Sequence, residues 1–313
     1  MNPNVRLLAL ALFAGALFSE ATAEANCRTK ACDTTPSYGD VWDEQPQPTE
    51  CMRNAQGCYL DGTPLFWSSR CLNFAVQKDG SATSGIDAET ARGVIQMAFD
   101  SWLAADCGGG DTPSFRVHDK GIVSCDHAEY NQDATNQNLF VFRDEVWPYQ
   151  GAIDALALTT VSFNTETGEI YDADVELNSR DAYFTVTDEE GAISADLLSV
   201  VTHEAGHFLG LSHSSDSTAV MRNTGYSPGT TELRYLTPDD IAGVCEIFPP
   251  GQSLEGSCEP RHGFSSECGV KKDDEGCAVP YVGAKGRAGE RPWLIGVAMG
   301  LVLALAFFRR RRT

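Results

Sequence analysis

Apolar residues recur at three- and four-residue steps in three stretches of the chain, and this period predicts three amphipathic helices. Each stretch opens on polar and acidic residues that suit a helix start, at 86–90, at 194–196 and at 237–240. The apolar positions are Ala91, Val94, Ile95, Ala98, Phe99 and Trp102 in the first, Leu197, Leu198, Val201, Ala205 and Phe208 in the second, and Ile241, Val244, Cys245 and Phe248 in the third.

Between the first two helices the pattern changes to short runs of β-branched and aromatic residues, which are typical of strands. These runs are 114–117, 139–142, 155–163 and 169–177, with a turn at 165–168 and a further strand expected around Cys71. The order of strand, helix, several strands, helix, loop and helix predicts a twisted mixed sheet covered by helices, with a cleft along one sheet edge.

The second predicted helix carries two histidines and a glutamate with the spacing of a metal site. His203 and His207 stand four residues apart, so both imidazoles lie on one helix face and can bind one ion. Glu204 is carried beside them, close enough to take a proton from a metal-bound water. Gly210 ends the helix, and the reversal brings His213 as a third nitrogen ligand. Three protein ligands leave one coordination position of zinc open, as in catalytic zinc sites. The alternative is a surface helix whose histidines bind no metal.

The motif continues from His213 through Ser214 to Met221 as HSSDSTAVM. This stretch resembles the metzincin clan of zinc endopeptidases, and Ser214 resembles the matrixin branch, the matrix metalloproteinase-like enzymes. The resemblance covers 64–249. It implies an α+β fold of the α/β-type metzincin architecture, with a twisted mixed five-stranded sheet, covering helices, an active-site helix and a methionine turn. It also implies that Met221 forms a hydrophobic floor under the zinc ligands without binding the metal.

These features predict a zinc-dependent endopeptidase with one catalytic zinc. In this mechanism zinc polarises the scissile carbonyl and lowers the pKa of its bound water. Glu204 takes the proton of that water and passes it to the leaving amine, so no covalent intermediate is needed. The resemblance implies that 155–160 is the edge strand on which a peptide substrate lies, and that a specificity pocket lies between His203 and 221–235. Two alternatives stay open: a non-catalytic surface binding or adhesion protein on a metzincin scaffold, and a zinc hydrolase of non-peptide amides.

Three carboxylates, Asp172, Asp174 and Glu176, alternate along one predicted strand and therefore share one side of it. Their repulsion would be relieved by a hard cation, and carboxylate oxygens suit Ca²⁺. The segment also resembles the family stretch that carries calcium and a structural zinc. No histidine lies in this run, so a histidine-rich structural zinc site is not expected. The alternative to calcium is a solvated acidic strand face.

The two ends of the chain predict export and attachment to a surface. Arg6, the apolar run 7–18 and the small residues at 21–23 are typical of a signal peptide. The apolar stretch 293–308, followed by four arginines, falls just short of a membrane span of about 20 residues. Together with Cys277 it resembles the C-terminal sorting tails of myxobacterial surface proteins, with Cys277 as the processing or lipidation site. A plain stop-transfer anchor is the alternative.

These features divide the chain into five parts. We expect a signal peptide at 1–23, a cysteine-containing N-terminal segment at 24–63, a matrixin-like catalytic domain at 64–250, a cysteine-containing stalk at 251–291 and a hydrophobic anchor or sorting tail at 292–313. Neither flank has enough apolar residues for a core of its own.

Eleven cysteines in an exported chain predict disulfides, and the odd number leaves one over, for which Cys277 is the natural candidate. The pairing cannot be deduced from the sequence. Matrixins are often kept latent by a propeptide cysteine in a Pro-Arg-Cys-Gly context, and the sequence contains no such motif. Latency is therefore absent or is provided by Cys51 or Cys58, and we favour disulfides for both.

The formal net charge of −21 disfavours nucleic acids and anionic surfaces as partners. The expected partners are a protein or peptide substrate and a membrane, reached through the C-terminal tail. The sequence predicts neither the cleavage preference nor the oligomeric state.

Overall fold

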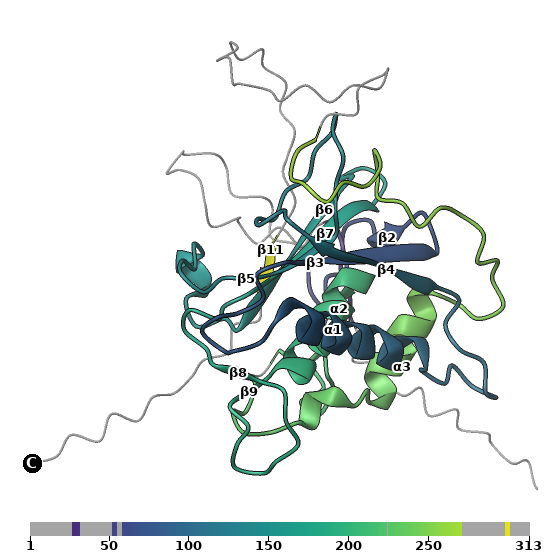
Figure 1. The fold of residues 1–313 in the computed structure, drawn as a ribbon. Coiled ribbons are helices and arrows are strands. Elements are labelled where there is room, and N and C mark those ends of the chain that lie inside the picture. The colour runs from purple at the N-terminus through teal and green to yellow at the C-terminus, as the bar shows by residue number, and fades with distance from the viewer. Residues whose placement is uncertain (1–26, 32–51, 55–57, 224, 271–297, 301–313) are drawn as a thin grey trace, which may run out of the picture.

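The computed structural model describes residues 27–31, 52–54, 58–223, 225–270 and 298–300, which form a twisted sheet with helices on one face (Figure 1). Two long helices, α1 (Ala88–Leu103) and α2 (Leu197–Leu209), lie side by side beneath the sheet. A shorter helix, α3 (Pro238–Ile247), lies beside them. Two 3-10 helices complete the helical elements of the described residues, η1 (Gln150–Ala152) and η2 (Glu232–Arg234).

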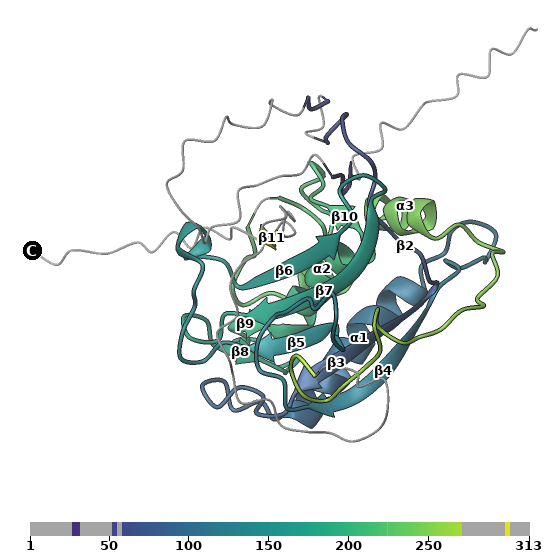
Figure 2. The ribbon, with the colours of Figure 1, turned by 90° about the horizontal axis from the view of Figure 1, so that it is seen from above.

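Five strands make the central sheet, in the order β6-β7-β5-β3-β4 (Figure 2). Neighbouring strands run parallel except β6, which is antiparallel to β7. Their bounds are β3 (Cys71–Gln77), β4 (Arg116–Val123), β5 (Leu139–Phe142), β6 (Ala157–Phe163) and β7 (Glu169–Leu177). The expected mixed sheet covered by helices is therefore confirmed.

Shorter strands are added to this frame. β2 (Phe66–Trp67) pairs in parallel with β7, and β11 (Ala298–Gly300) pairs antiparallel with the outer edge of β6. Two small ladders lie apart from the sheet. They join β1 (Cys27–Arg28) with β10 (Leu211–Ser212), and β8 (Phe184–Thr185) with β9 (Ala195–Asp196).

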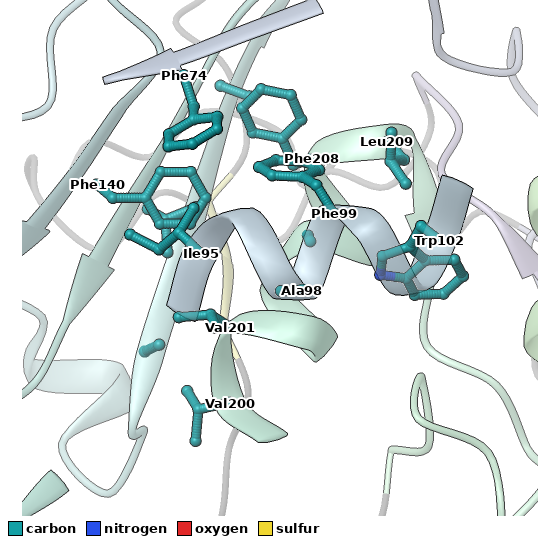
Figure 3. Packing of buried hydrophobic residues seen from close by; sticks show 14 of the residues in the cluster. Phe74, Ile95, Ala98, Phe99, Trp102, Phe140, Val200, Val201, Phe208 and Leu209 are labelled. Atoms are coloured by element: carbon teal, nitrogen blue, oxygen red, sulfur yellow. The ribbon is translucent and has the colours of Figure 1, made fainter. Parts of the chain in front are cut away.

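The main core fills the space between the sheet and the two long helices (Figure 3). Phe74 of β3 and Phe140 of β5 meet Phe99 of α1 and Phe208 of α2, with ring centroids 5.2–6.3 Å apart. All four side chains are buried, and each such burial contributes about 1.5–3 kcal/mol. Trp102 of α1 also donates its indole N–H to a carbonyl of α2. These contacts fix α2 against both the sheet and α1.

The C-terminal segment 251–270 lies against the opposite face of the sheet from the helices. Cys71–Cys258 and Cys125–Cys268 are disulfides, so two points of this segment are bonded to β3 and to the end of β4. Phe264 packs on a second core made by Ala75 of β3, Val123 of β4, Cys125, and Leu139 and Val141 of β5. This segment lies within 251–291, the region expected to be a stalk. The sequence shows the cysteines but not their partners, which lie more than 140 positions away in the chain.

The N-terminal part of the described chain is also cross-linked. Cys27 and Cys58 form a disulfide, as expected for Cys58 and against its use as a zinc-binding thiol. A further disulfide, Cys107–Cys245, joins the end of α1 to α3. Cys51, Cys277 and the expected signal peptide at 1–23 lie outside the described residues.

No helix in the described ranges has the length and apolar character that crossing a membrane requires. Of the stretch expected to anchor the chain, 293–308, only Ala298–Gly300 is described, and it forms β11. The expected C-terminal membrane helix is therefore not found among the described residues.

Gly206, in the middle of α2, is where the helix comes closest to its neighbours. A Cβ added there would lie 2.2 Å from Sδ of Met221 and 3.0 Å from the ring of Trp102. Contacts that short require the neighbours to move. Glycine at this position therefore lets Met221 and α1 approach the back of the helix.

We predict that Gly206→Ala lowers the free energy of unfolding by about 1–3 kcal/mol, because the methyl group overpacks the space beside Met221. Denaturant-induced unfolding of the purified chain measures this. The matched control is Gly93→Ala in α1, where nothing lies within 4 Å of the added Cβ. There alanine should stabilise by about 0.5–1 kcal/mol through helix propensity. Equal effects of the two substitutions would contradict the packing argument.

Candidate metal centre

Helix α2 is anchored at its N-terminus by a buried ion pair. Asp196 is the N-cap residue, and its Oδ2 accepts from the backbone N–H of Ser199 at 2.9 Å. Arg234 of η2 donates to both oxygens of the same carboxylate, at 2.8 and 2.6 Å. Because Asp196 is fully buried, this bidentate pairing satisfies a charge that would otherwise be costly. The helix ends at Gly210, whose φ of 108° allows the chain to reverse.

Three histidine side chains meet at one point after this reversal. Nε2 of His207 lies 3.1 Å from Nε2 of His203 and 3.2 Å from Nε2 of His213. The opposite ring nitrogens are engaged elsewhere: Nδ1 of His203 lies 2.6 Å from the carbonyl oxygen of Val220, and Nδ1 of His207 lies 2.9 Å from that of Leu211. A carbonyl oxygen only accepts, so these Nδ1 atoms carry the protons. The Nε2 lone pairs of His203 and His207 are therefore left facing each other.

Burial keeps these imidazoles neutral. It lowers the pKa of His207 to about 4 and, together with the nearby His207, the pKa of His213 to about 3. The pKa of His203 is also lowered well below its usual value by burial and by the two neighbouring histidines. Neutral imidazole is the form that binds metal.

The donor set fits zinc. Two nitrogens that share a tetrahedral zinc at about 2.0–2.1 Å are about 3.3 Å apart, close to the separations found here. The unprotonated Nε2 atoms of His203 and His207 lie 3.1 Å apart and repel each other, and a cation would remove that repulsion. With three protein ligands, a fourth coordination position stays open.

Glu204 lies next to the histidines and is fully buried. Its Oε2 accepts a hydrogen bond from the hydroxyl of Thr159 on β6 at 2.6 Å. Within the described part of the chain, Oε1 has no hydrogen-bond partner. Burial raises the pKa of Glu204 to about 8, and the Thr159 hydroxyl opposes this rise. A cation held by the histidines would also oppose the rise in this pKa. It would thereby favour the carboxylate form of Glu204, which accepts protons.

Met221 packs behind the histidines rather than among them. Its side chain is buried and lies against Gly206, on the body of the ligand-bearing helix. The backbone N–H groups of Val220 and Met221 donate to the two oxygens of Asp240 at 2.8 and 2.9 Å. Asp240 also closes the capping box of α3 with Thr237. One carboxylate therefore ties the turn at Met221 to the start of α3.

The carboxylates of β7 lie on the sheet face away from the histidines, and they are not solvated. Asp172, Asp174 and Glu176 are at most 2 % exposed, so the alternative of a solvated acidic face is wrong. Period-two alternation places them on one side, as expected, but the segments that pack over that side exclude water. Glu176 accepts from Nε of Arg143 at 2.5 Å.

The two aspartates of this cluster differ in how well they are satisfied. Asp174 accepts from the backbone N–H groups of Glu129 and Leu139, at 2.9 and 2.7 Å. By contrast, Oδ1 of Asp172 has no hydrogen-bond partner among the described residues. Burial, and then the charge of Asp174, raise the pKa of Asp172 well above its usual value. A buried oxygen in this state needs a proton or a cation.

Sequence reasoning missed three residues of this site. Nothing in the sequence connects Thr159 to Glu204, because the two are 45 positions apart on a strand and a helix. Asp240 was recognised only as a helix-start residue, and its bonds to the turn at Met221 depend on the fold. No sequence motif marks Arg234 as a residue of the site. Its partner Asp196 is recognisable as a helix-start residue, and this was the one available indication that a basic group lies nearby.

Comparison with known proteins supports the interpretation of the three histidines as a zinc site. Residues 126–249 match the Matrixin family model. The chain is similar to Metalloendoproteinase 1-MMP of Arabidopsis thaliana, with 28% identity over 63% of this chain and 48% of the relative. It is 33% identical to Matrix metalloproteinase-C of Caenorhabditis elegans over 61% of this chain and 30% of that protein. Rat matrilysin is 42% identical over 22% of this chain and 24% of its own length.

The chain thus spans less than half the length of these curated relatives. The matched region nevertheless contains all three histidines, Glu204 and Met221. Together with the mixed sheet and its two underlying helices, these matches identify 126–249 as a region that resembles the matrixin family and is similar to proteins named as metalloendoproteinases and matrix metalloproteinases.

Proposed function

We propose that this chain is an exported zinc endopeptidase in which His203, His207 and His213 hold the metal and Glu204 is the general base. The observation that carries the proposal is the convergence of three neutral Nε2 atoms beside a buried carboxylate with one unpartnered oxygen. Met221 has the structural role that the matrixin resemblance implies, as part of the hydrophobic floor beneath the histidines.

Zinc, when bound, supplies a Lewis acid that polarises the scissile carbonyl and makes water more acidic. The protein supplies the proton transfers and the geometry. Glu204 accepts the proton of the attacking water at Oε1 and then delivers it to the nitrogen of the leaving amine. The backbone carbonyls of Val220 and Leu211 hold the imidazole rings of His203 and His207 in one orientation and one tautomer.

We assign the substrate to the outer edge of β6, in line with the predicted edge strand at 155–160. A peptide would join the sheet as an extra antiparallel strand through backbone hydrogen bonds. The pairing of β11 with this edge supports the assignment, because Met299 is the register partner of Thr159. An extended segment of this chain therefore already pairs with that edge at Leu158, Thr159 and Thr160, and a substrate would take its place.

The proposal that the protein is exported is supported by its cross-links. Four disulfides join described residues, and such bonds persist in oxidising compartments. Retention at a surface through 292–313 and processing at Cys277 stay proposals that rest on the sequence alone.

We predict that Glu204→Ala lowers kcat for cleavage of an unfolded protein by at least about 100-fold, because the proton acceptor is lost, while zinc stays bound. Cleavage assays and elemental analysis of the purified chain measure the two quantities, with a zinc chelator on the wild type as a second control. A variant that cuts at the wild-type rate would contradict the role of Glu204. A folded, zinc-loaded wild type that cuts nothing would favour a binding protein, and one that cuts only small amides would favour an amide hydrolase.

We also keep calcium as a proposal at the cluster of Asp172, Asp174 and Glu176. The unpartnered Oδ1 of Asp172 supports it, whereas Glu176 already has Arg143 as a partner. Asp172 is therefore the residue on which the proposal depends. The competing occupant of the cluster is a proton.

The proton and the cation predict opposite dependences on pH. The folded-state pKa of Asp172 lies above its unfolded value of about 3.9. Without calcium, the stabilising effect of this proton is therefore complete below about pH 4 and is lost as the pH rises through the raised pKa. Asp172→Asn should remove the part of the decline in stability with rising pH that is due to this proton. Calcium should raise the midpoint of thermal unfolding more at pH 8 than at pH 5, because it binds the deprotonated form. No effect of calcium at pH 8 would contradict the calcium proposal.

A further inference from the structure

The hydroxyl of Thr159 is the one partner described for the side chain of Glu204. Thr159 lies within β6, where its backbone is held between β7, through Val175, and β11, through Met299. Its side chain is fully buried and faces α2. The donor therefore comes from a sheet strand and the acceptor from a packed helix, and such elements hold side chains more precisely than loops do.

We propose that Thr159 is a positioning residue that fixes the carboxylate of Glu204, so that Oε2 is occupied and Oε1 alone faces the reacting water. This inference rests on the proposed function, because it concerns the orientation of the base in that reaction. It assigns a task to a residue whose hydroxyl bonds, among the described residues, go to Glu204.

The distances show which acceptor takes the hydroxyl proton. Oγ1 of Thr159 lies 2.6 Å from Oε2 of Glu204 and 3.4 Å from the backbone oxygen of the same residue. A hydroxyl has one proton to donate, and the shorter contact lies in the range of a strong bond to a carboxylate. The backbone oxygen needs no such partner, because it lies in the interior of a helix. The hydroxyl is therefore committed to the carboxylate.

A glutamate carboxylate needs this constraint because its terminal torsion is broad and roughly two-fold. Without a partner on Oε2 the group can rotate, and either oxygen can turn away from the reacting atoms. Threonine is a suitable donor because its β-branched side chain is stiff at χ1. Small errors in the position of a catalytic group reduce rates strongly, by about 100-fold for a displacement of about 1 Å.

The competing explanation is that Thr159 is an ordinary core residue whose methyl group fills space. Two substitutions separate these explanations, because they remove opposite parts of the side chain. Thr159→Val keeps the shape and removes the hydroxyl, whereas Thr159→Ser keeps the hydroxyl and removes the methyl group. A positioning role makes valine the damaging change, and a packing role makes serine the damaging one.

The matched control is Thr202→Val in α2. Thr202 is equally buried and lies two positions from Glu204, but its hydroxyl donates to the carbonyl of Leu198 at 2.7 Å within the same helix. This control loses a buried hydroxyl of the same kind without losing any contact to the carboxylate.

The experiment measures kcat, KM, zinc content and the midpoint of thermal unfolding for the full chain and these three variants, with an unfolded protein as substrate. We expect Thr159→Val to lower kcat by about 10- to 100-fold, with KM and zinc content close to the wild type. Thr159→Ser should keep kcat within about three-fold, and Thr202→Val should behave as the wild type in kcat.

Each outcome decides between explanations. An active wild type with equal kcat in Thr159→Val and Thr202→Val overturns the positioning role and leaves the proposed function intact. A folded, zinc-loaded wild type without activity overturns both. If Thr159→Val does not fold or does not bind zinc, Thr159→Ser and Thr159→Ala decide: activity in the serine variant alone supports the role, and equal activity in both overturns it.

Discussion

The burial of α2 is the constraint on which the rest of the structure depends. Nearly every residue of this helix is buried, although it carries two histidines and a glutamate. Each buried polar atom then needs a partner. Carbonyl oxygens of Val220 and Leu211 satisfy the Nδ1 atoms, and Arg234 neutralises the N-cap residue. Oε1 of Glu204 is left without a partner among the described residues, and we assign the proton transfer to it.

The same constraint explains the turn that follows α2. The back of the helix can approach Met221 and Trp102 only because Gly206 has no side chain. Asp240 of α3 accepts hydrogen bonds from the backbone of that turn. Helix α3 therefore helps to fix the position of Met221 relative to α2. These packing interactions therefore help to position the helix that carries His203 and His207.

The second face of the sheet is stabilised differently. Disulfides join the segment 251–270 to β3 and β4, and Gln137 donates to the carbonyls of Ser265 and Glu267 in that segment. On the acidic side of β7 the segment 126–143 packs over the carboxylates, where Glu129 and Leu139 donate to Asp174 and Arg143 donates to Glu176. The carboxylates there face a low-dielectric environment, which is why the pKa of Asp172 is raised.

Local patterns predicted the parts of the structure that local physics controls. The helical period from Ala91 to Trp102 predicted α1, and the spacing of His203, His207 and His213 predicted their convergence around a chain reversal at Gly210. The rest depends on contacts between distant segments. The bond from Thr159 to Glu204 requires β6 to pack on α2, and the burial of Asp172 requires other segments to cover β7. No spacing in the sequence shows either of them.

The central claim is that three histidine Nε2 atoms bind one zinc and leave one coordination position free. Anomalous diffraction at the zinc edge from crystals of the zinc-loaded chain tests this most directly. The account predicts a single strong peak about 2.0–2.1 Å from Nε2 of His203, His207 and His213, with no fourth protein ligand. A metal bound elsewhere, or one enclosed by four protein ligands, would contradict it.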